Sequence, residues 1–437
     1  MIFGLPAILG LIPLLVYIVL AFKGRDIAFV VLLCTVIGAI MTGQTPIEFG
    51  ASLYSALGSF MALVGFIIMM GAGLGEVLRQ TQVADTIVTT IVTKSGVKSR
   101  NSVTVAVMFT SCLLVALLGT LAGANAIIAP IIIPIVASMG ITPSTLSVLL
   151  HGAGATGLYL GPFTPPVVTY MELTGVSYGE FLINAGIPIS IVLWIITYIN
   201  AKKTQKETEG IESYTAEDMA DTKQVNITQQ AKNATLVFLI AMLVMIVYGI
   251  LFKGGAAFVL TVMLVVSFVT GLVGGMNPGE IVSAIITGGS RMYKMFFMFV
   301  LYDPFMGYIT ASGAFTAIAE LMNPIMSQVG SVGFMILSTL IGIFGVSGAA
   351  VAQAKVMNDM FAAFVSDMNI PMGLWALVLL VGSQITSFAY PTGDMVGQMG
   401  LARSSSLKPM LKNGMMIAVF TILYVVVRGF IYSSSGI

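Results

Sequence analysis

Four charged side chains stand inside otherwise apolar stretches of this sequence. Asp303 lies in the run from Met298 to Pro304, Lys355 and Asp359 are four residues apart, and Asp394 follows a proline turn. Burying such a charge in a membrane costs at least about 2.5–3.5 kcal/mol, which makes each a functional candidate. We assign Asp303, Asp359 and Asp394 to ion coupling, because a carboxylate can bind Na⁺ or carry a proton. Lys355 either contacts an anionic substrate or pairs with Asp359 on one helix face.

Two Gly-rich breaks interrupt apolar helix patterns, and each could form half of a binding site. They run from Gly119 to Asn125 and from Gly345 to Ala350. Such breaks free backbone carbonyls that can coordinate Na⁺, and they create half-helix N-termini that suit a carboxylate. The simpler alternative is that small residues here only let helices pack closely. We expect Gly123 to face the ion, and the substrate to contact Thr120, Asn125, Ser347, Gly348 and Gln353, with Thr164 and Thr392 completing the ring.

The breaks belong to a longer spacing pattern along the chain. Three corresponding pairs are Gly123 and Gly348, 225 residues apart, Pro143 and Pro371, 228 apart, and Pro165 and Pro391, 226 apart. Two apolar halves that are interrupted at the same points are typical of secondary transporters. In such proteins the substrate site is expected where the breaks meet, near the bilayer midplane.

The composition requires a membrane environment. The chain is 57% hydrophobic and only 8% charged, whereas soluble domains carry about 25% charged residues. We therefore predict an all-α polytopic membrane protein, because backbone in lipid must be hydrogen-bonded internally. A net charge of +1 argues against a nucleic-acid partner. Cys34 and Cys112 fall in apolar runs and indicate neither a disulfide nor a metal site.

One polar segment, residues 201–232, divides the chain into halves at 1–200 and 233–437. We interpret this segment as a mobile cytoplasmic linker. Lys and Arg are enriched on the inner side of a membrane, which places residues 23–25, 94–100 and 403–412 inside as well. The second half then enters the membrane from the opposite side to the first, which predicts inverted repeats. Four basic residues fit this topology less cleanly: Lys253, Arg291, Lys294 and Arg428.

From about residue 27 to 431 the chain resembles the ion-transporter superfamily, which includes dicarboxylate, citrate and gluconate carriers and NhaC-type sodium/proton antiporters. The resemblance is carried by Gly119 to Asn125, Gly152 to Gly157, Thr164 to Pro166, Gly345 to Gly348 and Pro391 to Asp394. The Ser-Asn-Thr signature of the sodium/dicarboxylate branch is absent as such. The resemblance implies a homodimer in a bacterial inner membrane, with a transport domain that slides against a scaffold, as in elevator-type transporters.

Function classes other than transport explain the pattern less well. Intramembrane aspartyl proteases need Gly-x-Gly-Asp, but position 391 before Gly393-Asp394 is proline. A channel predicts a continuous polar pore stripe instead of paired breaks. We expect a Na⁺- or H⁺-coupled carrier of a small organic anion, with an NhaC-type Na⁺/H⁺ antiporter as the alternative. We expect no enzyme activity, no metal site and no cofactor beyond the transported ion; the predicted partners are the substrate, the bilayer and a second copy.

Overall fold

A computed structural model of the chain describes residues 6–94, 99–215, 218, 227–344 and 350–434. The described residues form helices and contain no strand. Among them, seven helical segments are long and apolar enough to cross a membrane: Phe60–Gln80, Arg100–Leu118, Leu121–Ser138, Tyr178–Thr208, Gln229–Leu251, Met372–Ala389 and Lys408–Ser434. The chain is therefore an integral membrane protein built from helices, as the composition predicts.

The first half contains a short opening helix, a series of spans and several short connecting helices. Its elements are η2 (Ala7–Leu11), α1 (Ile12–Phe22), α2 (Ile27–Thr42), α3 (Pro46–Ala56), α4 (Phe60–Gln80), α5 (Val83–Lys94), α6 (Arg100–Leu118), α7 (Leu121–Ser138), α8 (Pro143–Leu160), α9 (Pro165–Thr174), α10 (Tyr178–Phe181), the π-helical turn η3 (Leu182–Gly186) and α11 (Ile187–Thr208).

The second half begins with a long span and ends with another. Its elements are α13 (Gln229–Leu251), α14 (Phe258–Val273), α15 (Pro278–Ser290), α16 (Tyr293–Ala311), α17 (Ala314–Phe344), α18 (Ala350–Asp367), α19 (Met372–Gln384), α20 (Thr386–Ala389), α21 (Gly393–Leu401) and α22 (Lys408–Ser434). α17 consists of two helices that meet at a kink at Gly330, whose φ is 64°.

The order of the helices in the second half parallels that in the first, down to the way some of them begin. α3 and α15 each follow a helix of 16 residues and each start with a proline. Thr45 and Glu48 form a reciprocal capping box at α3, and Asn277 and Glu280 form one at α15. Both boxes satisfy backbone N–H groups that the first helical turn leaves unpaired. Similar local sequences thus start similar elements at matching places.

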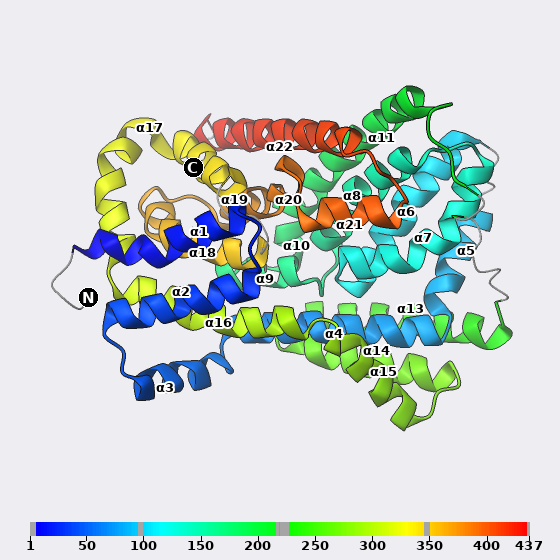
Figure 1. Cartoon of the computed structure of the whole chain (residues 1–437), viewed down its shortest axis with the longest axis horizontal. Helices are drawn as coiled ribbons and strands as arrows, with labels where there is room; N and C mark the ends of the chain where they lie inside the picture. Colours follow the sequence, from blue (N-terminus) through cyan, green and yellow to red (C-terminus); the bar gives the residue numbers. More distant parts are fainter. Residues whose placement is uncertain (1–5, 95–98, 216–217, 219–226, 345–349, 435–437) are drawn as a thin grey trace.

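The helices gather into two groups. In the first group, α1–α4 lie with α13–α16: α4 packs against α14, α15 and α16, and α16 packs against α2 and α3. In the second group, α6–α11 lie with α18–α22: α8 packs against α6, α11 and α21, and α19 packs against α9 and α18. Figure 1 shows α4, α14, α15 and α16 along the lower side, and α8, α11, α21 and α22 above them. Each group therefore combines helices from both halves.

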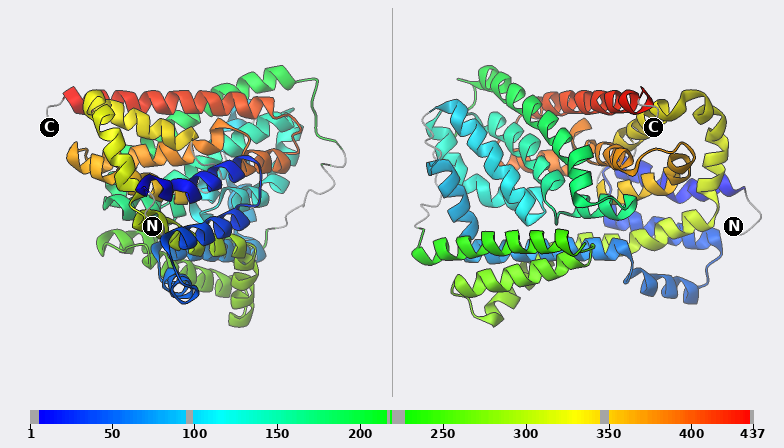
Figure 2. Two further views of the ribbon diagram at one scale, coloured as in Figure 1. Left: turned by 60° about the vertical axis from the view of Figure 1, so that its left-hand side comes forward. Right: turned by 180° about the vertical axis from the view of Figure 1, so that it is seen from behind.

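Two elements connect these groups at opposite ends of the molecule. α5 runs between them at the right of Figure 1, and α17 does so at the left. α5 contacts α4 and α13 of the first group and α6 and α7 of the second. α17 contacts η2 and α16 on one side and α19 and α22 on the other. The rear view in Figure 2 shows the same separation, with α13 lying along the lower group.

Close backbone packing holds the second group together at the Gly-rich segment Gly152 to Gly157. This segment is a continuous, buried part of α8. A Cβ added at Gly157 would lie 2.3 Å from the carbonyl oxygen of Cys112, and one at Gly152 would lie 2.0 Å from Oγ1 of Thr197. Small residues here let α6 and α11 approach α8, which is the packing role that glycine commonly has between membrane helices.

The polar segment at 201–232 is partly helical. α11 continues to Thr208, and α13 starts at Gln229. After α11, Glu212 accepts hydrogen bonds from the backbone N–H and the hydroxyl of Ser144 at 3.1 and 2.9 Å. The hydroxyl of Tyr214 donates to the carbonyl of Ala402 at 3.2 Å. The start of the predicted linker is thus attached to the second group of helices.

Candidate transport site

Three of the predicted charged residues lie together where α16 of the first group meets α18 of the second. Nζ of Lys355 donates to both carboxylate oxygens of Asp359, at 3.0 and 3.2 Å. The side chains of this pair are 25% and 23% exposed. Asp303 is partly buried, and its charge interacts with those of Lys355 and Asp359. With both carboxylates ionised and the amine protonated, the three residues carry a net charge of −1.

Helix geometry explains why Lys355 pairs with Asp359, and the hydrogen bonds of the described residues show that Asp303 has a different environment. Residues four apart face the same side of a helix, so α18 brings the amine and the carboxylate together. Asp303 makes no hydrogen bond to any residue that the structure describes. It is therefore not held by backbone groups near Pro304, the simpler explanation of its presence. A carboxylate without such bonds, next to an ion pair, is available to a cation or a proton.

α16 contains a proline directly after Asp303. Pro304 lies within this helix and has no N–H to offer the carbonyl of Val300. The preceding turn is anchored from α2, because the hydroxyl of Thr35 donates to the carbonyl of Leu301 at 3.3 Å. The helix therefore presents a carboxylate and a carbonyl without an intrahelical donor within one turn. Both are oxygen ligands of the kind that Na⁺ prefers.

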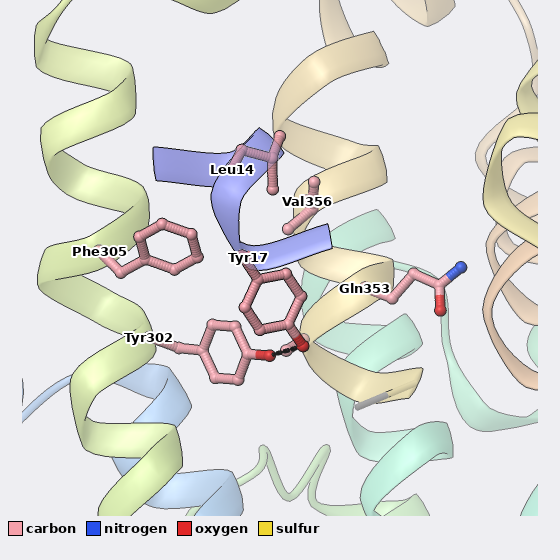
Figure 3. Close-up of a pocket in the computed structure, with 7 residues that line it drawn as sticks. Leu14, Tyr17, Tyr302, Phe305, Gln353 and Val356 are labelled. Carbon is pink, nitrogen blue, oxygen red and sulfur yellow. Dashed lines mark hydrogen bonds between the residues drawn. The ribbon is translucent and has the colours of Figure 1, made fainter. Parts of the chain in front are cut away.

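A small cavity lies between α1 and the two helices that carry the charged residues, α16 and α18, although none of the three charged residues lines it. Its volume is about 10 Å³, enough for about one water molecule. Figure 3 shows Tyr17 and Tyr302 at its wall, with the hydroxyl of Tyr302 donating to that of Tyr17. Gln353 and Val356 line it from α18, on either side of Lys355 in the sequence. The two tyrosines were not among the predicted site residues, because their contact joins residues 285 positions apart.

Gln353, predicted to contact substrate, connects α18 to three other elements of the second half. Its Nε2 donates to the carbonyl of Gly342, to that of Gly382 at 3.1 Å, and to the hydroxyl of Thr386 at 3.3 Å. The side chain is 5% exposed. It thus joins α18 to α17, α19 and α20, close to the cavity.

The first Gly-rich break forms a second cluster with a helix from the other half. The hydroxyl of Thr120 accepts from the N–H of Gly123 at 2.9 Å and so caps α7. Asn125 is fully buried; its Oδ1 accepts from Ser111 at 2.6 Å, and its Nδ2 donates to the carbonyl of Leu150 at 3.0 Å. The same Nδ2 donates to Oε1 of Gln398, on α21, at 2.7 Å. Two amides from opposite halves thus meet in the interior.

Each of the two predicted proline turns precedes a short helix that packs against the other half of the chain. Thr164 precedes α9, where its hydroxyl donates to the carbonyls of Leu158 and Gly161 at 2.7 and 2.9 Å. Thr392 caps α21 by accepting from the N–H of Met395 at 3.4 Å. α9 packs against α18 and α19, whereas α21 packs against α7 and α8. Each turn thus precedes a short helix that packs against helices of the opposite half.

The remaining predicted residues have separate positions. Asp394 lies in the first turn of α21, and its side chain is exposed. Ser347 and Gly348 lie outside the described residues. The structure therefore brings the predicted residues into two clusters, one around Asp303 and Lys355 and one around Asn125. Gln398 was not among the predicted residues, although its place in the second turn of the helix that follows Pro391 is a usable signal.

Comparisons with known proteins find similarity to transporters. The sequence model of the Na⁺/H⁺ antiporter family matches residues 2–199. The fold resembles the Alcanivorax borkumensis YdaH transporter at 13% identity, with 90% of each chain covered and a TM-score of 0.63. It also resembles Neisseria gonorrhoeae MtrF, described with a class of antimetabolite efflux pumps, at 14% identity, with 98% of this chain and 95% of that chain covered and a TM-score of 0.62. No curated protein matches the sequence.

The protein has a transporter fold. The match of its first half to an antiporter family and the likeness of nearly the whole chain to two transporters support a secondary transporter. They indicate a carrier rather than an enzyme. The predicted membership of the ion-transporter superfamily stays a prediction at that finer level.

Proposed function

We propose that this protein exchanges Na⁺ for H⁺ across the membrane and that Asp303, Lys355 and Asp359 form its cation site. The observation that carries the proposal is the charge cluster between α16 and α18, in which an unbonded carboxylate lies beside an ion pair. Because Lys355 is already paired with Asp359, it is less available to an organic anion than the sequence alone indicates. The family match of the first half also favours the antiporter.

The charge of the cluster accounts for exchange. A net charge of −1 in apolar surroundings favours one added monovalent cation, and two added charges would be costly there. Na⁺ bound between Asp303 and Asp359 displaces the ammonium group of Lys355 from its partner. A proton bound to either carboxylate removes the charge that Na⁺ needs. The two ions therefore compete for one site, and each is carried in the absence of the other.

The arrangement of the helices supports a sliding movement. The cluster lies at the boundary between the two groups of helices, because α16 belongs to the first and α18 to the second. We infer that these groups correspond to scaffold and transport domains, connected by α5 and α17. The parallel order of helices, together with the Lys and Arg distribution, favours two inverted repeats. A homodimer in a bacterial inner membrane follows from the superfamily resemblance.

A carrier of a small organic anion is the second candidate. MtrF, which the chain resembles over almost its full length, is described with antimetabolite efflux pumps. In this chain, the bond between Asn125, the fifth residue of α7, and Gln398, the sixth residue of α21, brings these two helices together. Helix N-termini carry partial positive charge and suit a carboxylate. This second cluster is therefore the place where an anion would bind.

Reconstituted protein separates the two candidates. Liposomes that contain a pH-sensitive dye receive an inward Na⁺ gradient without any organic compound. We expect Na⁺ entry to drive proton efflux, which would raise the internal pH. If the internal pH changes only after small carboxylates are added, the antiporter proposal is wrong and the active carboxylate identifies the substrate.

A further inference from the structure

Arg428 carries a positive charge in a membrane-spanning helix, and none of the ion pairs among the described residues includes it. Its Nη1 donates to the hydroxyl of Tyr424 at 3.2 Å, and its Nη2 donates to Oδ1 of Asn184 at 3.1 Å. The side chain is partly buried, and no ion pair links it to any acidic residue in the described part of the chain. A guanidinium group has five N–H donors, so these two bonds leave donors for a further, anionic ligand.

The place of Arg428 along α22 corresponds to the boundary of the membrane. Lys412 is paired with Glu207 near the start of this helix. Arg428 follows Lys412 by 16 residues, which at 1.5 Å per residue is roughly 24 Å along the axis. The hydrocarbon core is about 30 Å thick. The guanidinium can therefore reach lipid headgroups on the side opposite to Lys412, where the Lys and Arg rule does not predict a basic residue.

Asn184 is held in position before any ligand binds. It lies in the π-helical turn η3, and its Nδ2 donates to the carbonyl of Glu180 at 2.9 Å. A Cβ added at Gly373 would lie 2.8 Å from the same nitrogen, so the amide is fixed against α19. Its oxygen consequently points toward Arg428. Single π turns inside helices frequently occur at functional sites.

An apolar groove is lined by residues of α11 that directly follow this turn. It has a volume of about 370 Å³ and lies between the end of α8 and the first turns of α11. Its wall includes Ile187, Ile191, Ile195 and Trp194, and the three isoleucines are 43%, 53% and 54% exposed. Ser190, also in the wall, is 4% exposed, and its hydroxyl has no hydrogen-bond partner among the described residues.

We propose that Arg428 and Asn184 bind the headgroup of an anionic phospholipid whose acyl chain occupies the groove along α11. Charge complementarity selects the headgroup, because a phosphate accepts the guanidinium donors that the protein leaves free. The exposed isoleucines offer apolar contacts to the acyl chain of the lipid. Arg428 would hold the headgroup of this lipid, and the groove lined by the α11 residues that follow η3 would hold its acyl chain. The site belongs to the second group of helices and lies apart from Asp303, so it stands independently of the transported substrate.

Lipid binding to the purified protein tests this inference. We would titrate the delipidated full-length protein with phosphatidylglycerol and, separately, with phosphatidylcholine, measuring the shift in melting temperature and the bound lipid by native mass spectrometry. We expect phosphatidylglycerol to bind at least about tenfold more tightly than phosphatidylcholine. In Arg428→Gln this preference should be lost. Lys253→Gln removes one exposed basic charge elsewhere and should keep it.

Two further variants keep the test decisive if Arg428→Gln folds poorly. Arg428→Lys retains the charge but not the planar donors, and it should bind phosphatidylglycerol severalfold more weakly than wild type. Ile191→Trp fills the groove and should weaken binding while leaving Arg428 in place. Equal binding of both lipids by wild type would overturn the proposal. Unchanged phosphatidylglycerol binding in Ile191→Trp, or an equal shift with glycerol phosphate alone, would overturn the assignment of the acyl chain to the groove.

Discussion

Nδ2 of Asn125 donates to Oε1 of Gln398 at 2.7 Å, although the two residues are 273 positions apart. Asn125 belongs to the first Gly-rich break, and Gln398 belongs to the helix that follows the proline turn of the second half. Both side chains are fully buried. The bond therefore joins the two halves of the chain inside the second group of helices.

Removing either amide should destabilise the protein. Asn125→Ala leaves Gln398 and Ser111 without a buried partner, and an unpaired buried polar group costs about 1–3 kcal/mol. Gln398→Ala should have a similar but smaller effect. The double variant should be less destabilised than the two single effects combined, because the residues are in contact. Unfolding of the four proteins in detergent measures the coupling. The exposed pair of Gln229 and Asn233 is the matched control and should show coupling near zero.

Lys355 should compete with Na⁺ for the carboxylates. In Lys355→Gln the ammonium group is gone, and the Na⁺ concentration for half-maximal proton efflux should fall. We expect a change of up to about fivefold, because a partly exposed ion pair contributes about 1 kcal/mol or less. Lys294→Gln, which removes a basic partner of Asp26, should leave this concentration unchanged. An unaltered Na⁺ requirement in Lys355→Gln, with weaker binding of an organic anion, would instead favour the second candidate function.

The packing of α6 on α8 predicts a strong effect of one methyl group. Gly157→Ala places a Cβ 2.3 Å from the carbonyl oxygen of Cys112, so the helices must separate. Overpacking of this kind costs about 1–3 kcal/mol. Gly50→Ala, at an exposed helical position with nothing within 4 Å, should be neutral or stabilising by up to about 1 kcal/mol. Equal melting temperatures for the two variants would contradict the close packing of α6 on α8.

The sequence predicts features that depend on local chemistry. Apolar runs predict membrane helices, and the structure has them. Pro165 marks the start of α9, and the turn at Pro391 precedes α21. The four-residue spacing of Lys355 and Asp359 allows an ion pair, which the structure contains. In each case, residues near one another in the sequence determine the outcome.

Contacts between distant segments could not be predicted in this way. No local pattern indicates that Gln398 reaches Asn125 or that Tyr302 reaches Tyr17. Composition was also a poor guide at residues 201–208, where Lys, Gln and Glu extend α11 because they are good helix formers. The place of Asp303 next to Lys355 depends on how α16 packs on α18. The spacing of residues along the sequence does not indicate this packing.

The most direct measurement of the central claim is Na⁺ uptake driven by a pH gradient in liposomes, comparing wild type with Asp303→Asn. Asp367→Asn is the control, because Asp367 is an exposed carboxylate at the end of α18. We predict that wild type and the control accumulate Na⁺ when the lumen is acidic. Asp303→Asn should fold, elute as wild type in gel filtration, and accumulate none. Normal proton-driven Na⁺ uptake by Asp303→Asn would contradict the assignment of the cation site.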